Sequence, residues 1–154
     1  MEIAPWVSQL WTASIAPGEA LLRLVVALAL CGCLGFEREL VGRAAGLRTH
    51  MLVGLAAALL TIMAFEMFAW VRSLEERPTA DPLRLLEAIT AGVAFLAAGS
   101  IFREKDRVRG LTTGGGLWMA GAIGIAAGQG LLGLAAMATV LAVIVIAVLR
   151  RIEP

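Results

Sequence analysis

Charged side chains are scarce in this sequence, and this scarcity points away from a soluble protein. Only 16% of the 154 residues are charged, 60% are hydrophobic, and the mean hydropathy is +0.87. Soluble domains carry about 25% charged residues, so the composition excludes a typical soluble domain. From Leu111 to Leu149 no Asp, Glu, Lys, Arg or His occurs. One helix of that length would reach about 58 Å, roughly twice the hydrocarbon thickness of a bilayer, so the run predicts two membrane passes.

Other residue types and motifs that are absent or rare exclude further classes of function. The net charge of +1 supplies no strong basic field, which excludes a nucleic-acid binder held by such a field. The two cysteines, Cys31 and Cys33, would point to nearly opposite sides of a helix, so we expect packing residues rather than a disulfide or a metal pair. The single histidine, His50, is expected to be a solvated or capping residue. No HExxH, P-loop or nucleophile motif is present, so we expect no enzyme activity.

Five apolar stretches have the length of a membrane span. The alternation and turn spacing of a β-barrel are absent, which leaves helices as the spanning structure. The long uncharged run divides at Gly128-Gln129-Gly130, its only turn signal. The sequence therefore predicts an all-α polytopic membrane protein with five transmembrane helices. The expected spans are Leu21–Phe36, Met51–Val71, Leu85–Phe102, Leu111–Ala127 and Leu131–Leu149.

The distribution of Lys and Arg predicts the orientation. Nine of them lie in the loop after the first span, the loop after the third span and the C-terminus, against four on the other side. Cytoplasmic loops carry this excess, so we expect the N-terminus outside and the C-terminus in the cytoplasm. Residues 1–20 have no basic n-region of a signal peptide and are expected to lie at the outer interface. Residues 21–149 would form the transmembrane domain and residues 150–154 a short cytoplasmic tail.

A shift of 64 residues superimposes the first two spans on the third and fourth. Gly35 then falls on Gly99, and Gly46-Leu47 falls on Gly110-Leu111. Each half reads as a helix, a glycine, a charged loop, Gly-Leu-x-Thr and a second helix. This pattern indicates a parallel repeat of two helical hairpins followed by a fifth helix. The alternative is that any two membrane hairpins need glycines and turns at similar positions.

Three ionisable residues lie inside the expected spans: Arg23, Glu66 and Glu87. Such groups cost several kcal/mol in a bilayer unless they are paired or face water, and they are functional candidates by default. We hypothesise that Arg23 pairs with Glu87 or Glu66 across the bundle. The alternative is that these side chains reach toward the outer headgroups.

Small residues recur every fourth position along the fourth span. They are Gly116, Ala120, Gly124 and Gly128. A ladder of this kind lets two helix backbones approach closely in lipid. It predicts a helix interface, either with another span of the chain or with a second copy in a homodimer.

The loop after the first span concentrates charge. One interpretation is a solvated loop that obeys the positive-inside rule. A second is that Glu37 and Glu39, beside Arg38, hold a hydrated divalent cation. A third is an anion site formed where two helices begin near several arginines. The two helices begin at Arg48-Thr49 and at Thr112-Thr113.

Several motifs in order resemble the MgtC/SapB family of bacterial membrane proteins over about residues 20–149. The resemblance rests on Gly35-Phe36-Glu37-Arg38-Glu39, Ala45-Gly46-Leu47-Arg48-Thr49-His50, Arg23, Gly92-Val93-Ala94-Phe95-Leu96-Ala97-Ala98-Gly99, Arg109-Gly110-Leu111-Thr112-Thr113, Trp118 and Gly128-Gln129-Gly130. The sequence departs from the family at Gly114-Gly115-Gly116, where we expect alanine or serine. It also ends four residues after Arg150, so the soluble C-terminal domain of the virulence-linked members is expected to be missing.

The resemblance implies a bacterial inner-membrane protein linked to growth at low magnesium and to acid or ion stress. It leaves two functions open. In the first, the protein binds or transports a cation, with Mg²⁺ as the candidate ion, and Glu37 and Glu39, or Glu66 and Glu87, contact it. Transport would then require a homodimer. In the second, the protein regulates another membrane protein, such as ATP synthase, through helix contacts. The family pattern singles out Arg23, Glu37, Arg38, Arg48, Thr49, Thr112, Thr113 and Trp118.

Overall fold

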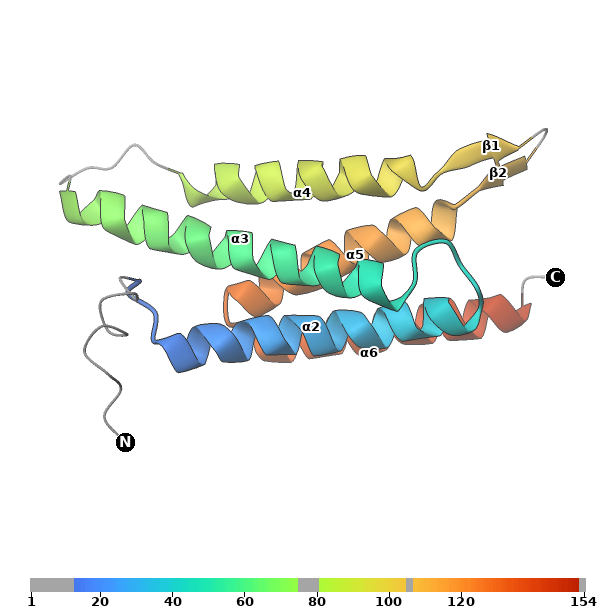
Figure 1. Ribbon diagram of the computed structural model, residues 1–154, viewed down its shortest axis with the longest axis horizontal. Coiled ribbons are helices and arrows are strands. Elements are labelled where there is room, and N and C mark those ends of the chain that lie inside the picture. Colours follow the sequence, from blue (N-terminus) through green and yellow to red (C-terminus); the bar gives the residue numbers. More distant parts are fainter. Residues whose placement is uncertain (1–12, 75–80, 105–106, 153–154) are drawn as a thin grey trace.

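The computed structural model describes residues 13–74, 81–104 and 107–152, which form five helices and one β-hairpin. The elements are α2 (Pro17–Leu40), α3 (Leu47–Leu74), α4 (Pro82–Gly99), β1 (Phe102–Glu104), β2 (Arg107–Arg109), α5 (Leu111–Gly128) and α6 (Leu132–Ile152). Successive helices run in opposite directions in an elongated bundle (Figure 1). The described part of the chain therefore confirms the all-α prediction, apart from the hairpin.

The two ends of the bundle are named here by the loops that they carry. The amino-terminal end holds residues 13–16, before α2, and residues 129–131, between α5 and α6. The carboxy-terminal end holds residues 41–46, between α2 and α3, and the hairpin before α5. Figure 1 shows the hairpin and the end of α6 at the same end of the bundle.

Four of the expected spans lie within their helices to within one residue, and the third span is the exception because it runs past the end of its helix. We expected it to continue to Phe102, but α4 ends at Gly99, and the N–H groups of Ser100 and Ile101 bond to carbonyls of its last turn. Phe102 instead pairs with Arg109 in the antiparallel hairpin. Strands of three residues each are too short to show an alternating pattern, so these two could not be predicted from the sequence.

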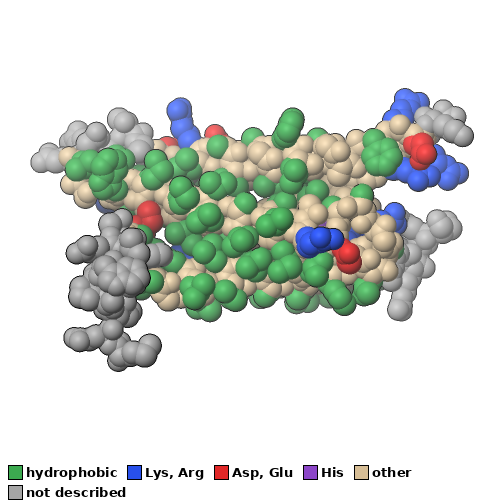
Figure 2. Space-filling model, viewed as in Figure 1, with side chains coloured by type: hydrophobic (Ala, Val, Ile, Leu, Met, Phe, Trp, Pro, Cys, Tyr) green, Lys and Arg blue, Asp and Glu red, His purple; other side chains and the backbone are tan. Residues whose placement is uncertain are grey.

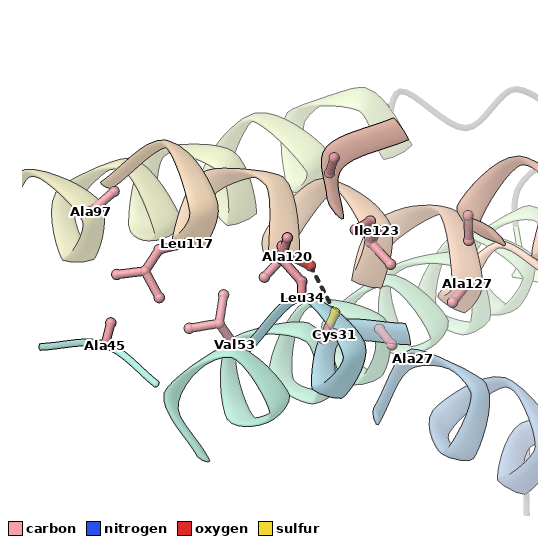
Figure 3. Packing of buried hydrophobic residues seen from close by; sticks show 13 residues of the cluster. Ala27, Cys31, Leu34, Ala45, Val53, Ala97, Leu117, Ala120, Ile123 and Ala127 are labelled. Atoms are coloured by element: carbon pink, nitrogen blue, oxygen red, sulfur yellow. Dashed lines mark hydrogen bonds between the residues drawn. The ribbon is translucent and has the colours of Figure 1, made fainter. Parts of the chain in front are cut away.

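Helix α5 is the central element, since it packs against all four other helices. Seven of its ten buried residues are glycine or alanine, which let neighbouring backbones approach closely. Figure 3 shows the core where α2, α3 and α5 meet, with Cys31 directed at Ala120. The Cys31 thiol donates a hydrogen bond to the Ala120 carbonyl oxygen at 3.4 Å, which agrees with its expected packing role.

The outer surface of the bundle is strongly apolar. Large hydrophobic side chains are exposed along every helix, with Phe95 of α4 83% exposed and Trp70 of α3 63% exposed. Figure 2 shows hydrophobic side chains along the visible length, and most of the Lys and Arg in view at the end that carries the hairpin. Helices α2 and α3 are long and apolar enough to cross a membrane. Helices α4 and α5 have 18 residues each, and α6 contains the shorter apolar segment Leu132–Val148.

Candidate functional site

Arg38 is the most buried charged side chain at the carboxy-terminal end. It lies in the last turn of α2 and is 3% exposed. Its Nε and Nη2 atoms each lie 2.7 Å from Oε2 of Glu37. A guanidinium withdrawn from solvent requires an anionic partner close by, and the neighbouring residue supplies it. The structure therefore joins two of the predicted site residues in an ion pair within one helix.

Glu39 has a different role at the same end. Its Oε2 atom accepts a hydrogen bond from the backbone N–H of Leu47, the first residue of α3, at 3.0 Å. A carboxylate at this position satisfies a free N–H group and complements the helix dipole. Gly46 permits the approach, because any side chain there would overlap the Glu39 carboxylate.

The predicted cation site at Glu37 and Glu39 receives no geometric support. One carboxylate faces Arg38 and the other caps α3, so the two engage separate partners. Within the described ranges, no group of three or more His, Cys, Asp and Glu side chains is placed to hold a metal ion. A magnesium site at these carboxylates stays a prediction.

His50 is fully buried in the first turn of α3, so its expected role as a solvated residue is wrong. Its Nδ1 atom lies 2.9 Å from the carbonyl oxygen of Gly46. Its Nε2 atom has no hydrogen-bond partner among the described residues. A Cβ at Gly116 of α5 would stand only 3.0 Å from that nitrogen. The sequence analysis did not predict this contact. The only hint was that His50 lies four residues after Gly46, in a segment that carries several glycines.

The small-residue ladder of α5 is used inside the chain. All four ladder residues are buried. The three glycines face α3, and the Ala120 carbonyl oxygen accepts the hydrogen bond from Cys31 of α2. A Cβ at Gly124 would overlap the carbonyl oxygen of Gly54, and one at Gly128 would stand 2.6 Å from the carbonyl oxygen of Ala58. The predicted helix interface is confirmed. In the described part of the chain the ladder glycines are covered by α3, and the homodimer stays a prediction.

Arg23 lies at the amino-terminal end and does not form the expected pair with Glu87 or Glu66. Its Nη1 atom donates a hydrogen bond to the carbonyl oxygen of Gly128 at 2.9 Å. Its Nη2 atom pairs with Glu19, one turn earlier in α2. The guanidinium thus places a positive charge at the C-terminus of α5, where the helix dipole is negative.

Glu66 and Glu87 have separate surroundings. The Glu66 carboxylate accepts hydrogen bonds from the N–H of Ser14 at 2.6 Å, the Ser14 hydroxyl at 2.8 Å and the N–H of Ile15 at 3.0 Å. Glu66 therefore fastens the segment before α2 to the far end of α3. Glu87 is exposed on α4. The expected outer interfacial segment, residues 1–20, is described only from residue 13 onward.

The two helix starts that could form one anion site line different cavities. Thr49 borders an apolar cavity of about 450 Å³ together with Phe95 and Leu117, while Arg48 is exposed. Thr112 and Thr113 line a more polar cavity of about 330 Å³ together with Arg43 and Arg109. The anion interpretation therefore applies to the start of α5 alone. Trp118, which the family pattern also singled out, is half exposed on α5.

Comparison with known proteins gives the family. Residues 24–154 match the model of the MgtC family. The chain is 37% identical over 134 residues to "Putative magnesium transporter YhiD" of Escherichia coli K12, an alignment that covers 87% of this chain and 62% of that protein. It is 42% identical over 127 residues to "Protein MgtC" of Brucella abortus strain 2308, covering 82% of this chain and 50% of that protein.

The chain thus spans about half to three-fifths of the length of these relatives. No solved structure matches it significantly. The family match covers most of the chain, from within α2 to the last residue. The chain belongs to the MgtC family of membrane proteins.

Proposed function

We propose that this protein is an inner-membrane component of bacterial magnesium homeostasis that acts by contacting another membrane protein. The link to magnesium rests on the family and on the name of the relative YhiD. The mode of action rests on the way in which the helices pack. No catalytic step is part of the proposal.

The contact between α5 and α3 is the observation that carries this proposal. Gly124 lies against Gly54, and Gly128 lies against Ala58, so closely that a single methyl group would meet the facing backbone. Mg²⁺ sheds its water shell reluctantly and travels with several waters. A hydrated ion would have to part these two helices to pass between them. The close packing therefore supports a protein that works through its outer surface.

The proposed arrangement has all five helices crossing the membrane, with the amino-terminal end outside. Helices of 18 residues are about 27 Å long, close to the thickness of the hydrocarbon core. The excess of Lys and Arg at the carboxy-terminal end supports its cytoplasmic location. Labelling of Ser14→Cys and Arg103→Cys, in a chain with Cys31 and Cys33 replaced by alanine, tests this. A reagent that does not cross membranes should modify only the first variant in intact cells.

Magnesium transport is the second candidate, and the name of the relative YhiD favours it. A transporting unit would require two copies, with the ion path at their interface. Glu37 and Glu39 would then contact the ion at the carboxy-terminal end, after exchange of their present partners.

One experiment separates the two functions. The purified protein is reconstituted into liposomes that contain a magnesium-sensitive dye, and the same gene is expressed in a bacterium that lacks its own family member and grows poorly at low magnesium. We expect growth to be restored without magnesium entry above that of protein-free liposomes. Entry that is lost in Glu37→Gln and kept in Glu104→Gln, which changes an exposed carboxylate of β1 at the same end of the bundle, would establish transport instead.

A further inference from the structure

Two cavities of opposite character adjoin at the start of α5, which lies at the carboxy-terminal end of the bundle. The first, of about 330 Å³, is lined by Arg43, Arg109 and the start of α5. The second, of about 450 Å³, is an apolar groove between α5 and α6, lined by residues that include Gly115 and Leu141. Thr112 borders both cavities. A polar chamber therefore opens directly beside an apolar groove.

The first cavity concentrates positive potential. Arg43 and Arg109 are both exposed, from the loop before α3 and from β2. Nε of Arg109 lies 2.8 Å from Oε2 of Glu104, but a guanidinium has five N–H donors and this pair does not use all of them. Helix α5 begins here with Gly110 at its N-cap, without a side-chain hydrogen bond. The uncapped N–H groups of the first turn add to the attraction for an anion.

The groove has the character of a site for a hydrocarbon chain. Along α5 it runs from Thr112 to Met119, about 10 Å along the helix axis. On the α6 side it is bordered by Leu141 and Val145. Gly115 forms part of its floor, and a Cβ added there would meet no described atom within 4 Å. The groove is therefore open where a side chain would otherwise fill it.

We propose that the two cavities together bind one anionic phospholipid. Its phosphate lies between Arg43, Arg109 and the start of α5, and one acyl chain lies over Gly115 in the groove between α5 and α6. A free phosphate would use only the first cavity, and a neutral apolar ligand only the second. Because the two cavities share Thr112, a molecule with a charged head and an apolar tail can occupy both at once. Basic pockets of this kind between membrane helices recognise anionic headgroups.

Native mass spectrometry of the detergent-purified protein, with added phosphatidylglycerol or phosphatidylcholine, tests the proposal. We expect adducts with phosphatidylglycerol and few with phosphatidylcholine. Arg43→Gln should weaken phosphatidylglycerol binding by about fivefold, the factor expected for one basic residue near an anionic lipid. Its control is Arg48→Gln, an exposed arginine at the same end that lines neither cavity.

Gly115→Leu tests the groove separately, because it fills the open floor. It should also reduce phosphatidylglycerol binding. Gly92→Leu is its control, since Gly92 is an exposed helical glycine of α4 with the same open surroundings. Equal thermal unfolding temperatures would show that each variant is folded.

Three results would overturn the proposal. Equal binding of the two lipids would mean that the arginines do not select charge. Unchanged phosphatidylglycerol binding in Gly115→Leu, with displacement by inorganic phosphate, would mean an anion site without a groove for the acyl chain. A dimer in the mass spectrum that disappears in Gly115→Leu would mean that a second copy of the chain occupies the groove.

Discussion

Gly124 of α5 lies directly on the backbone of Gly54 of α3, so that a Cβ on Gly124 would overlap the Gly54 carbonyl oxygen. A Cβ on Gly54 would in turn overlap the Sγ atom of Cys31 in α2. Three helices therefore meet at one level of the bundle with almost no side chain between them. This contact sets how closely α2, α3 and α5 approach one another at that level.

Gly124→Ala tests this contact. The methyl group has to push α5 away from α3, and overpacking of this kind costs about 1–3 kcal/mol. We expect a corresponding loss in the free energy of unfolding, measured by thermal unfolding in detergent. Gly92→Ala is the control, because it makes the same change on an open face of α4, where it should be neutral or stabilise by up to about 1 kcal/mol. Equal effects of the two substitutions would contradict the role of Gly124 in packing.

His50 and Gly116 should be energetically coupled. A Cβ on Gly116 would stand 3.0 Å from His50 Nε2, tighter than ordinary contact, in a fully buried site. We expect Gly116→Ala to destabilise the protein in the presence of His50 and to be tolerated in a His50→Ala background, where the methyl group enters vacated space. Contacting residues of this kind show coupling of about 0.5–3 kcal/mol in a double-mutant cycle. Additive effects within the error of unfolding measurements would count against the contact.

The sequence predicted the helices and the central interface because both depend on local patterns. Apolar runs of membrane length located α2, α3, α5 and α6 to within a few residues, and the spacing of four located the buried face of α5. The features that the sequence did not predict depend on distances between residues that are far apart in the chain. The helix spacing decides whether Arg23 reaches a carboxylate or the carbonyl oxygen of Gly128.

The burial of His50 has the same origin. Its position at the start of a helix, within a charged motif, suggested contact with solvent. It is buried because Gly35 of α2 and Gly116 of α5 let two helices close over it. No single stretch of sequence contains all three residues, so the burial of His50 follows only from the packed structure. The repeat of two hairpins stays a prediction.

Arg23 should stabilise the C-terminus of α5 more through Gly128 than through Glu19. Arg23→Met keeps the length of the side chain but removes both the hydrogen bond and the positive charge at the helix end, an expected loss of about 1–2 kcal/mol in unfolding free energy. Glu19→Gln removes only a solvent-exposed ion pair, worth less than about 1 kcal/mol.

Hydrogen exchange provides a local measurement of this effect. The amides of Gln129, Gly130 and Leu131 bond to carbonyls in the last turns of α5 and report directly on its C-terminus. Their exchange should accelerate in Arg23→Met and stay near the wild-type rate in Glu19→Gln. Equal acceleration in both variants would show that the ion pair, and not the bond to Gly128, holds this end of the helix.

Glu66 should hold the segment before α2 against the end of α3. Its carboxylate accepts three hydrogen bonds, two from Ser14 and one from Ile15, and bonds to a charged acceptor are worth more than neutral ones. In Glu66→Gln the charge is lost and one oxygen becomes an amide donor. We expect the Ser14 and Ile15 amides to exchange with solvent about tenfold faster, from the loss of these charge-assisted bonds.

Two further variants define what such a result means. Ser14→Ala removes only the hydroxyl donor and should produce a smaller acceleration at Ile15. Glu87→Gln changes an exposed carboxylate on α4 and should leave both amides unaffected. If Glu66→Gln left the exchange of Ser14 and Ile15 at the wild-type rate, the three hydrogen bonds would contribute nothing to fixing this segment. The start of α2 would then be held by the bond from Arg23 to Gly128 and by the packing of α2 against its neighbouring helices.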